Sequence, residues 1–229
     1  MAVIEGGVSL ALQGVGAENY SPGHYTQYPP VVGSGGAYRL GMTSGVMAVS
    51  LAANAELFQF RYVTAASRVC IVQRVTISIG MHTVVATAVA GLSVNMAVAR
   101  AWTAAGSGGT RAVLTGDIAN LRTAHATSEV NDAGISTTAG LTAGTKTIDH
   151  ATSNLGAVSF STLTGAMTTT PGGQLLPETE LLGAYGPGGH PLVLANQEGF
   201  IIRNGTVAWP AGATWGFSVQ VLWLEGPNF

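Results

Sequence analysis

The sequence predicts an all-β fold: an antiparallel β-sandwich or jelly-roll-like domain with an extended N-terminal arm. Three observations predict it. Apolar and polar residues alternate with period two in several runs after residue 46, no long window has helical periodicity, and Gly- and Pro-rich turns separate the runs. Because alternate residues of a strand point to opposite faces, such runs give sheets with a buried face, and these pack in pairs.

The composition indicates a globular chain that associates with itself. Of the 229 residues 47% are apolar, and the mean hydropathy is +0.35, which is enough to build a core. Only 9% are charged, against about 25% in an ordinary soluble domain. Much of the surface must therefore consist of Gly, Ala, Ser and Thr, and we expect neighbouring copies to cover part of it.

Residues 1–45 are predicted to form the arm. Glycine and proline runs, such as Pro29–Pro30 and Gly33–Gly36, interrupt any regular period there. Tyrosines and apolar residues within the arm favour an arm pinned against a neighbouring subunit over a free linker. The predicted contact residues are Val8, Leu10, Leu12, Tyr20, Tyr25 and Tyr28.

The sandwich domain is predicted to span residues 46–229. Its first clear strand covers residues 56–62, where Phe58, Phe60 and Tyr62 share one face while Gln59 and Arg61 share the other, as in a half-buried strand. In residues 68–79, a single apolar face is interrupted only by Gln73. Residues 92–99 alternate large apolar side chains with small ones, which allows another layer to approach closely.

The second half of the domain begins with weak patterning and ends with a strong one. Residues 102–176 predict turns joining short strands, with one helical turn at 116–121. Residues 191–194 and 199–203 each predict a strand. Residues 215–224 alternate most regularly, with Trp215, Phe217, Val219, Val221 and Trp223 inward, and we expect this strand to be central in its sheet.

No motif of catalysis or metal binding emerges from the pattern. The histidines are scattered, without the spacing that puts two metal ligands on one face. Glu178 and Glu180 could share a face as an acid and base pair, although Pro177 and nearby leucines favour a solvated loop. We expect no enzymatic activity, no cofactor and no metal.

Two further residue types have a structural interpretation. Cys70 lies in an apolar run, which indicates a buried thiol rather than a reactive one. Trp215 and Trp223 lie on the inward face of their strand, so core packing is expected for them. Trp209, beside Pro210 in a turn, is the tryptophan predicted as an exposed contact residue.

Charge and hydropathy exclude several partners. Nine basic and eleven acidic residues give a net charge of −2 without a basic block, so we expect no nucleic-acid binding. Residues 84–99 are shorter than the roughly 20 apolar residues of a spanning helix and include Ser93 and Asn95, so no membrane partner is expected. Residues 1–7 lack the pattern of a secretory signal, so no export is expected.

Three segments carry a resemblance to a known class of proteins. Residues 52–61, 141–149 and 191–200 resemble small, uncharacterised β-rich structural proteins encoded by tailed bacteriophages, and the similarity spans roughly residues 46–225. The resemblance implies a location in the virion, after synthesis in the bacterial host cytoplasm. It assigns no catalytic or binding residue.

Two positions in a virion are open. A capsid decoration (cement) protein would sit outside the head as a homo-oligomer, commonly a trimer, with its arm on the major capsid protein. A tail or fibre component would present a loop such as residues 183–190 to a host glycan or an adaptor protein. Long fibre repeats are absent, which favours the capsid exterior.

Overall fold

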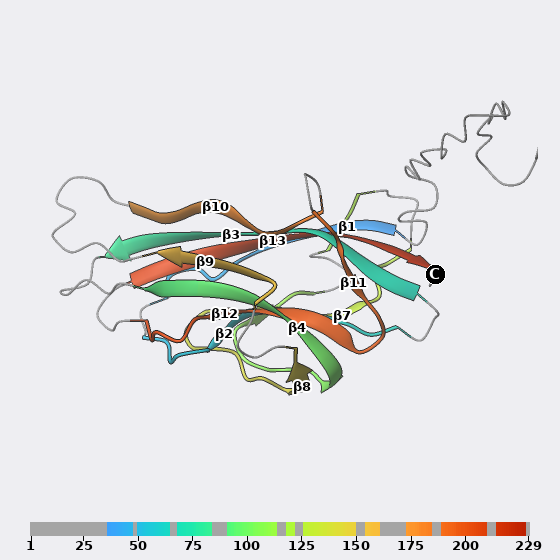
Figure 1. Cartoon of the computed structure of the whole chain (residues 1–229), viewed down its shortest axis with the longest axis horizontal. Coiled ribbons are helices and arrows are strands. Elements are labelled where there is room, and N and C mark those ends of the chain that lie inside the picture. Colours follow the sequence, from blue (N-terminus) through green and yellow to red (C-terminus); the bar gives the residue numbers. More distant parts are fainter. Residues whose placement is uncertain are drawn as a thin grey trace, which may run out of the picture.

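The computed structural model describes residues 36–47, 50–64, 68–83, 91–113, 118–121, 126–149, 154–160, 173–184, 189–209 and 214–227. Within these ranges the chain forms strands, turns and irregular segments but no helix. Figure 1 shows the strands arranged in two layers that lie face to face. The predicted antiparallel β-sandwich is therefore confirmed.

The first layer, sheet A, has the strand order β10-β3-β13-β1-β6, and β11 also pairs with β3. All these pairs are antiparallel. As predicted, the strand made from the regular C-terminal pattern, β13, is in the middle of its sheet. The bounds are β1 Gly36–Thr43, β3 Arg68–Thr83, β6 Ala119–Asn120, β10 Gly173–Gly183, β11 Leu192–Leu194 and β13 Thr214–Pro227.

The second layer, sheet B, has the order β5-β7-β2-β12-β4-β8, and β9 also pairs with β4. Its central strands β2 and β12 face the middle of sheet A across the core (Figure 1). The bounds are β2 Glu56–Tyr62, β4 Leu92–Ala104, β5 Thr110–Arg111, β7 Val130–Ile135, β8 Thr145–Ile148, β9 Gly156–Phe160 and β12 Glu198–Asn204.

Aromatic side chains join the two sheets. The ring of Phe60 in β2 lies 5.0 Å from Phe200 in β12 and 5.1 Å from Trp223 in β13, so one cluster spans both layers. All five inward residues predicted for β13 are buried. Contacts of this kind add about 0.5–1.5 kcal/mol each beyond the buried area.

The boundary between arm and sandwich lies earlier than predicted. Strand β1 begins at Gly36 and pairs along its whole length with β13, so residues 36–43 belong to the sandwich rather than to the arm. Tyr38, Leu40 and Met42 alternate with exposed residues and are buried. Sequence reasoning missed this short alternation because a glycine run directly precedes it and residues 1–45 as a whole are rich in glycine.

The sequence predicted a single apolar face for β3, but the strand does not keep one face along its length. The pairing with β13 shifts register between Leu222 and Trp223, which leaves Gln73 as an extra residue. A bulge of this kind reverses the alternation, because the side-chain period of a strand is two. Cys70 and Val72 therefore join Val75 in the core cluster.

Three local predictions are wrong. Strand β2 is buried on both faces rather than half-buried. Ala119–Asn120, in the predicted helical turn, pairs as strand β6 with β1. Glu178 and Glu180 lie in strand β10 rather than in a loop. Ala97 and Ala99 of β4 are buried in a small cluster with Trp102 and Ile201, against which Ile148 of β8 packs.

Candidate functional site

The outer face of sheet A is a shallow surface of small and mostly uncharged side chains. Three adjoining hollows of about 210, 430 and 350 Å³ follow β1, β13 and β3. Arg39 and Arg74 line the first hollow, and His82 lines the last. Between these ends the floor consists mainly of small or neutral residues, among them Gly41, Ser78, Gly80, Gly216, Ser218 and Gln220.

Two glycines of this floor have no visible role inside the described part of the chain. Gly41 and Gly80 lack the positive φ angles that require glycine. A Cβ atom added at either position would meet nothing within 4 Å. Glycine inside a strand costs roughly 0.5–1 kcal/mol relative to alanine, and it often marks a place where another backbone approaches closely.

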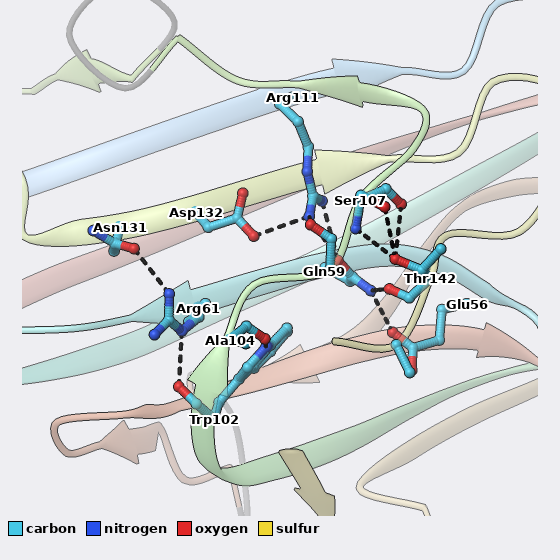
Figure 2. A network of polar contacts seen from close by, with 12 residues as sticks. Glu56, Gln59, Arg61, Trp102, Ala104, Ser107, Arg111, Asn131, Asp132 and Thr142 are labelled. Atoms are coloured by element: carbon cyan, nitrogen blue, oxygen red, sulfur yellow. Dashed lines mark hydrogen bonds and ion pairs between the residues drawn. The ribbon is translucent and has the colours of Figure 1, made fainter. Parts of the chain in front are cut away.

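The outer face of sheet B carries a different feature, a network of buried polar side chains on β2 (Figure 2). Arg61 donates hydrogen bonds to the carbonyl oxygens of Trp102 at 2.9 Å and Thr103 at 3.1 Å, and to Asn131 Oδ1 at 3.0 Å. Its guanidinium thus ties β2 to the end of β4 and to β7.

Glu56, Gln59 and Lys146 form the second part of this network. Lys146 Nζ lies 2.8 Å from Glu56 Oε2, and their side chains are only 2% and 8% exposed. Gln59 Nε2 donates to the same Glu56 oxygen at 2.6 Å and to the carbonyl oxygen of Thr142 at 2.7 Å. The ammonium also lies 4.4 Å from the ring centroid of Trp102, in a cation–π contact.

Arg111 completes the network from strand β5. Two of its nitrogens, Nη1 and Nη2, donate to Gln59 Oε1 at 3.0 Å each, and Nη2 also pairs with Asp132 Oδ2 at 3.0 Å (Figure 2). Two glycines make room for these side chains. A Cβ atom at Gly106 would meet the Gln59 amide at 2.4 Å, and one at Gly134 would meet Arg111 at 1.8 Å.

A bulge brings Glu56 and Gln59 to the same face. Residues three apart in a regular strand point to opposite faces. The register of β2 with β12 shifts between Phe58 and Glu56, so Leu57 is the extra residue. Leu57 and Phe58 both face the core, and Glu56 turns to the outer face beside Gln59.

Burial sets the ionisation of the charged members. Desolvation lowers the pKa of the Lys146 ammonium from its ordinary value, and the hydrogen bond to Glu56 opposes this shift. Desolvation also raises the pKa of Asp132, opposed by the charge of Arg111. The neutral amine is therefore easier to reach at Lys146 than at an exposed lysine.

The contact residues predicted from the sequence have two different outcomes. Val8, Leu10, Leu12, Tyr20, Tyr25 and Tyr28 lie outside the described residues. The prediction of an exposed Trp209 is wrong, because only 3% of this residue is exposed. Its ring stacks on that of Trp215, with the ring centroids 4.0 Å apart, and its backbone N–H donates to the carbonyl oxygen of Leu51 at 2.9 Å.

The other residues considered from the sequence have structural partners. Glu178 and Glu180 both pair with Arg74, at 3.6 and 3.0 Å, on the exposed surface of sheet A. Cys70 is buried, as predicted. The described part of the chain contains no group of three or more His, Cys, Asp or Glu residues placed to hold a metal ion. The described residues also include no helix long and apolar enough to cross a bilayer.

Sequence reasoning missed the network on β2. Two signals could have indicated it: Lys146 is the single lysine of the chain, and Gln59 and Arg61 interrupt a strand of aromatic residues. The bulge at Leu57 and the distant partner Arg111 could not be read from spacing, because they depend on tertiary pairing.

Comparisons with known proteins add no assignment. No protein-family model matches the chain, and neither a curated protein nor a solved structure shows significant similarity to it. A proposal about the function therefore rests on the two surfaces described above and on the resemblance of the sequence segments.

Proposed function

We propose that the chain is a non-enzymatic structural protein of a bacteriophage virion, a decoration protein that stabilises the head from the capsid exterior as a homo-oligomer, with a trimer as the expected form. The observation that carries this proposal is the open, glycine-containing outer face of sheet A. It supports a function in assembly, because glycine weakens a strand interior and often marks a place where another backbone approaches closely.

A second copy of the same chain is the proposed occupant of this face. Small hydroxyl and glycine residues allow two sheets to approach. The uncharged hydroxyls of Ser78 and Ser218 hydrogen-bond to each other, with their Oγ atoms 2.7 Å apart. The low charge of the whole chain supports the same conclusion, since surface between copies needs no ionised side chains for solubility.

Contact with the major capsid protein is assigned to residues 1–35, which precede strand β1. This segment contains the six contact residues predicted from the sequence. Extended segments bind neighbouring sheets by strand addition, in which main-chain hydrogen bonds supply affinity. Repetition of a weak contact over a shell multiplies its effect through avidity.

Labelling of intact particles tests this function. An antibody against the full chain is applied to virus particles released by the bacterium that carries the gene, and gold label is located by electron microscopy. Label spread over the heads is expected. Label confined to a vertex or tail would support the tail component instead, and unlabelled particles would contradict a virion location.

A truncated chain gives the matched control. Removal of residues 1–35 is expected to leave the sandwich folded, because β1 is retained, but to abolish binding to undecorated heads. Circular dichroism checks the fold, and co-sedimentation with heads checks binding. Unchanged binding of the truncated chain would contradict contact through this segment.

A further inference from the structure

Four neighbouring side chains bring together an amine, a carboxamide, a carboxylate and a guanidinium: Lys146, Gln59, Glu56 and Arg111. Lys146 supplies an amine, and Gln59 supplies a carboxamide. Glu56 Oε2 contacts both nitrogens, at 2.8 Å from Lys146 Nζ and 2.6 Å from Gln59 Nε2. One carboxylate oxygen is thus in position to take a proton from the amine and deliver one to the amide nitrogen.

The carbonyl group of Gln59 is polarised by a cation. Arg111 Nη1 and Nη2 both donate to Gln59 Oε1 at 3.0 Å. Attack on the adjacent carbon would place negative charge on this oxygen, where two charge-assisted donors are already aimed. Asp132, 3.0 Å from Arg111 Nη2, holds the guanidinium in place from the other side.

Burial shifts Lys146 toward the neutral amine, although Glu56 and the Trp102 ring stabilise the ammonium. The side chains of Lys146 and Glu56 are 2% and 8% exposed, and Trp102 lies against the amine. The pKa of Lys146 is lowered by this burial. A neutral lysine amine is a nucleophile, whereas the ammonium is not.

We propose that Lys146 and Gln59 form an intramolecular isopeptide bond. Glu56 accepts a proton from Lys146 Nζ, and the amine lone pair attacks the Gln59 carboxamide carbon. The tetrahedral oxyanion is stabilised by Arg111. Collapse of this intermediate breaks the bond to Gln59 Nε2, which takes the proton from Glu56. Glu56 then removes the remaining extra proton from Lys146 Nζ and passes it to the departing ammonia, which leaves as ammonium. The Nζ–C bond forms as the C–Nε2 bond breaks, no electron acceptor is needed, and Glu56 returns to its starting state.

This bond would join two strands by their side chains. Gln59 lies in β2 and Lys146 in β8, with the strands β12 and β4 between them in the order of sheet B. The link covalently closes the loop of the chain between residues 59 and 146, which limits unfolding of the outer strand. Each molecule reacts once, so the proposal concerns self-modification, and it does not depend on the proposed virion location.

Mass spectrometry of the purified full chain tests the proposal. The intact mass is expected to be lower than the sequence mass by one ammonia. After tryptic digestion, residues 40–61 and 123–203 are expected as one joined species, because trypsin does not cleave after a modified lysine. An unshifted mass would overturn the proposal. So would a loss of water with Lys146 joined to Glu56, since that product identifies a different acyl partner.

The single lysine gives an independent readout. In the denatured chain, an amine-specific reagent is expected to label the α-amine but not Lys146. In the Lys146→Arg and Glu56→Gln variants, the mass is expected to match the substituted sequence. Asp149→Asn, which removes an exposed carboxylate partner of Arg100, is the matched control and is expected to keep the bond. The wild-type measurement decides the question even where a variant fails to fold. Full labelling of wild-type Lys146 would contradict the bond.

Discussion

At the scale of single residues, buried carboxylates show how the fold uses its few charges. Glu225 in β13 is completely buried, and its Oε1 accepts hydrogen bonds from Ser128 Oγ at 2.6 Å, from the Glu129 backbone N–H at 3.1 Å and from Trp223 Nε1 at 3.2 Å. Desolvation raises its pKa above the ordinary 4.5, although these donors oppose the shift. The carboxylate therefore organises the segment before β7 at a cost in charge burial.

This cost predicts a pH dependence of stability. The folded chain holds the Glu225 proton more tightly than the unfolded chain, so the contribution is fully present below pH 4.5 and is lost as the pH rises through the raised pKa. A tenfold difference in proton affinity corresponds to about 1.4 kcal/mol. In thermal unfolding measured across this pH range, the Glu225→Gln variant is expected to lack the pH-dependent contribution of this residue to stability. An identical pH dependence of both chains would contradict the raised pKa.

Residue types were easier to predict than residue environments. Burial of Cys70 and Trp215 followed from their places in apolar patterns. Trp209 was assigned to the surface because it stands beside a proline in a turn, yet its indole fills the end of the core. The burial of Lys146 could not be predicted from its neighbours, because the carboxylate that pairs with it, Glu56, is distant in the sequence.

At the scale of elements, alternation predicted that strands exist but not which way each half of a strand faces. The C-terminal strand was predicted correctly because it alternates large apolar residues with smaller ones. In β3, residues 69–72 are apolar on both faces, so the pattern cannot reveal the reversal at Gln73. Only the pairing with β13 determines it.

Deletion of Gln73 tests the importance of the bulge. Without the extra residue, plain alternation from Val75 places Val72 and Cys70 on the core face, so the deletion is expected to keep Cys70 buried. Its reaction with a thiol reagent under native conditions should stay as slow as in the wild type, because burial and the raised thiol pKa still protect it. Gln73→Ala keeps the bulge and should react equally slowly. A deletion variant that keeps its fold by circular dichroism but reacts about tenfold faster than the alanine variant would contradict this account.

The polar face of β2 marks a second limit of pattern reading. Gln59 and Arg61 suggested a solvent-exposed face, and the alternation itself was read correctly. Residues of β4, β5 and β7 cover that face and hydrogen-bond to it, so the strand is buried on both faces. Composition shows that such residues are polar, but tertiary contacts decide whether water or protein satisfies them.

At the scale of the whole molecule, the account rests on one sheet face that the described chain leaves open. Sheet B covers its outer face with polar and apolar contacts of its own. Sheet A presents Gly41 and Gly80 above open space. This asymmetry between the two faces supports assembly through sheet A, in agreement with the low charge of the sequence.

Sedimentation velocity of the full chain over a range of concentrations tests this assembly most directly. We predict an oligomer for the wild type and a monomer of 23.2 kDa for Gly80→Leu, whose Cβ atom has no neighbour within 4 Å in its own sheet and whose side chain would fill the contact. Ser159→Leu, at an exposed position of β9 in sheet B, is the matched control and should remain oligomeric. A wild-type chain that sediments as a monomer at every concentration, or a Gly80→Leu chain that assembles as well as the control, would contradict the account.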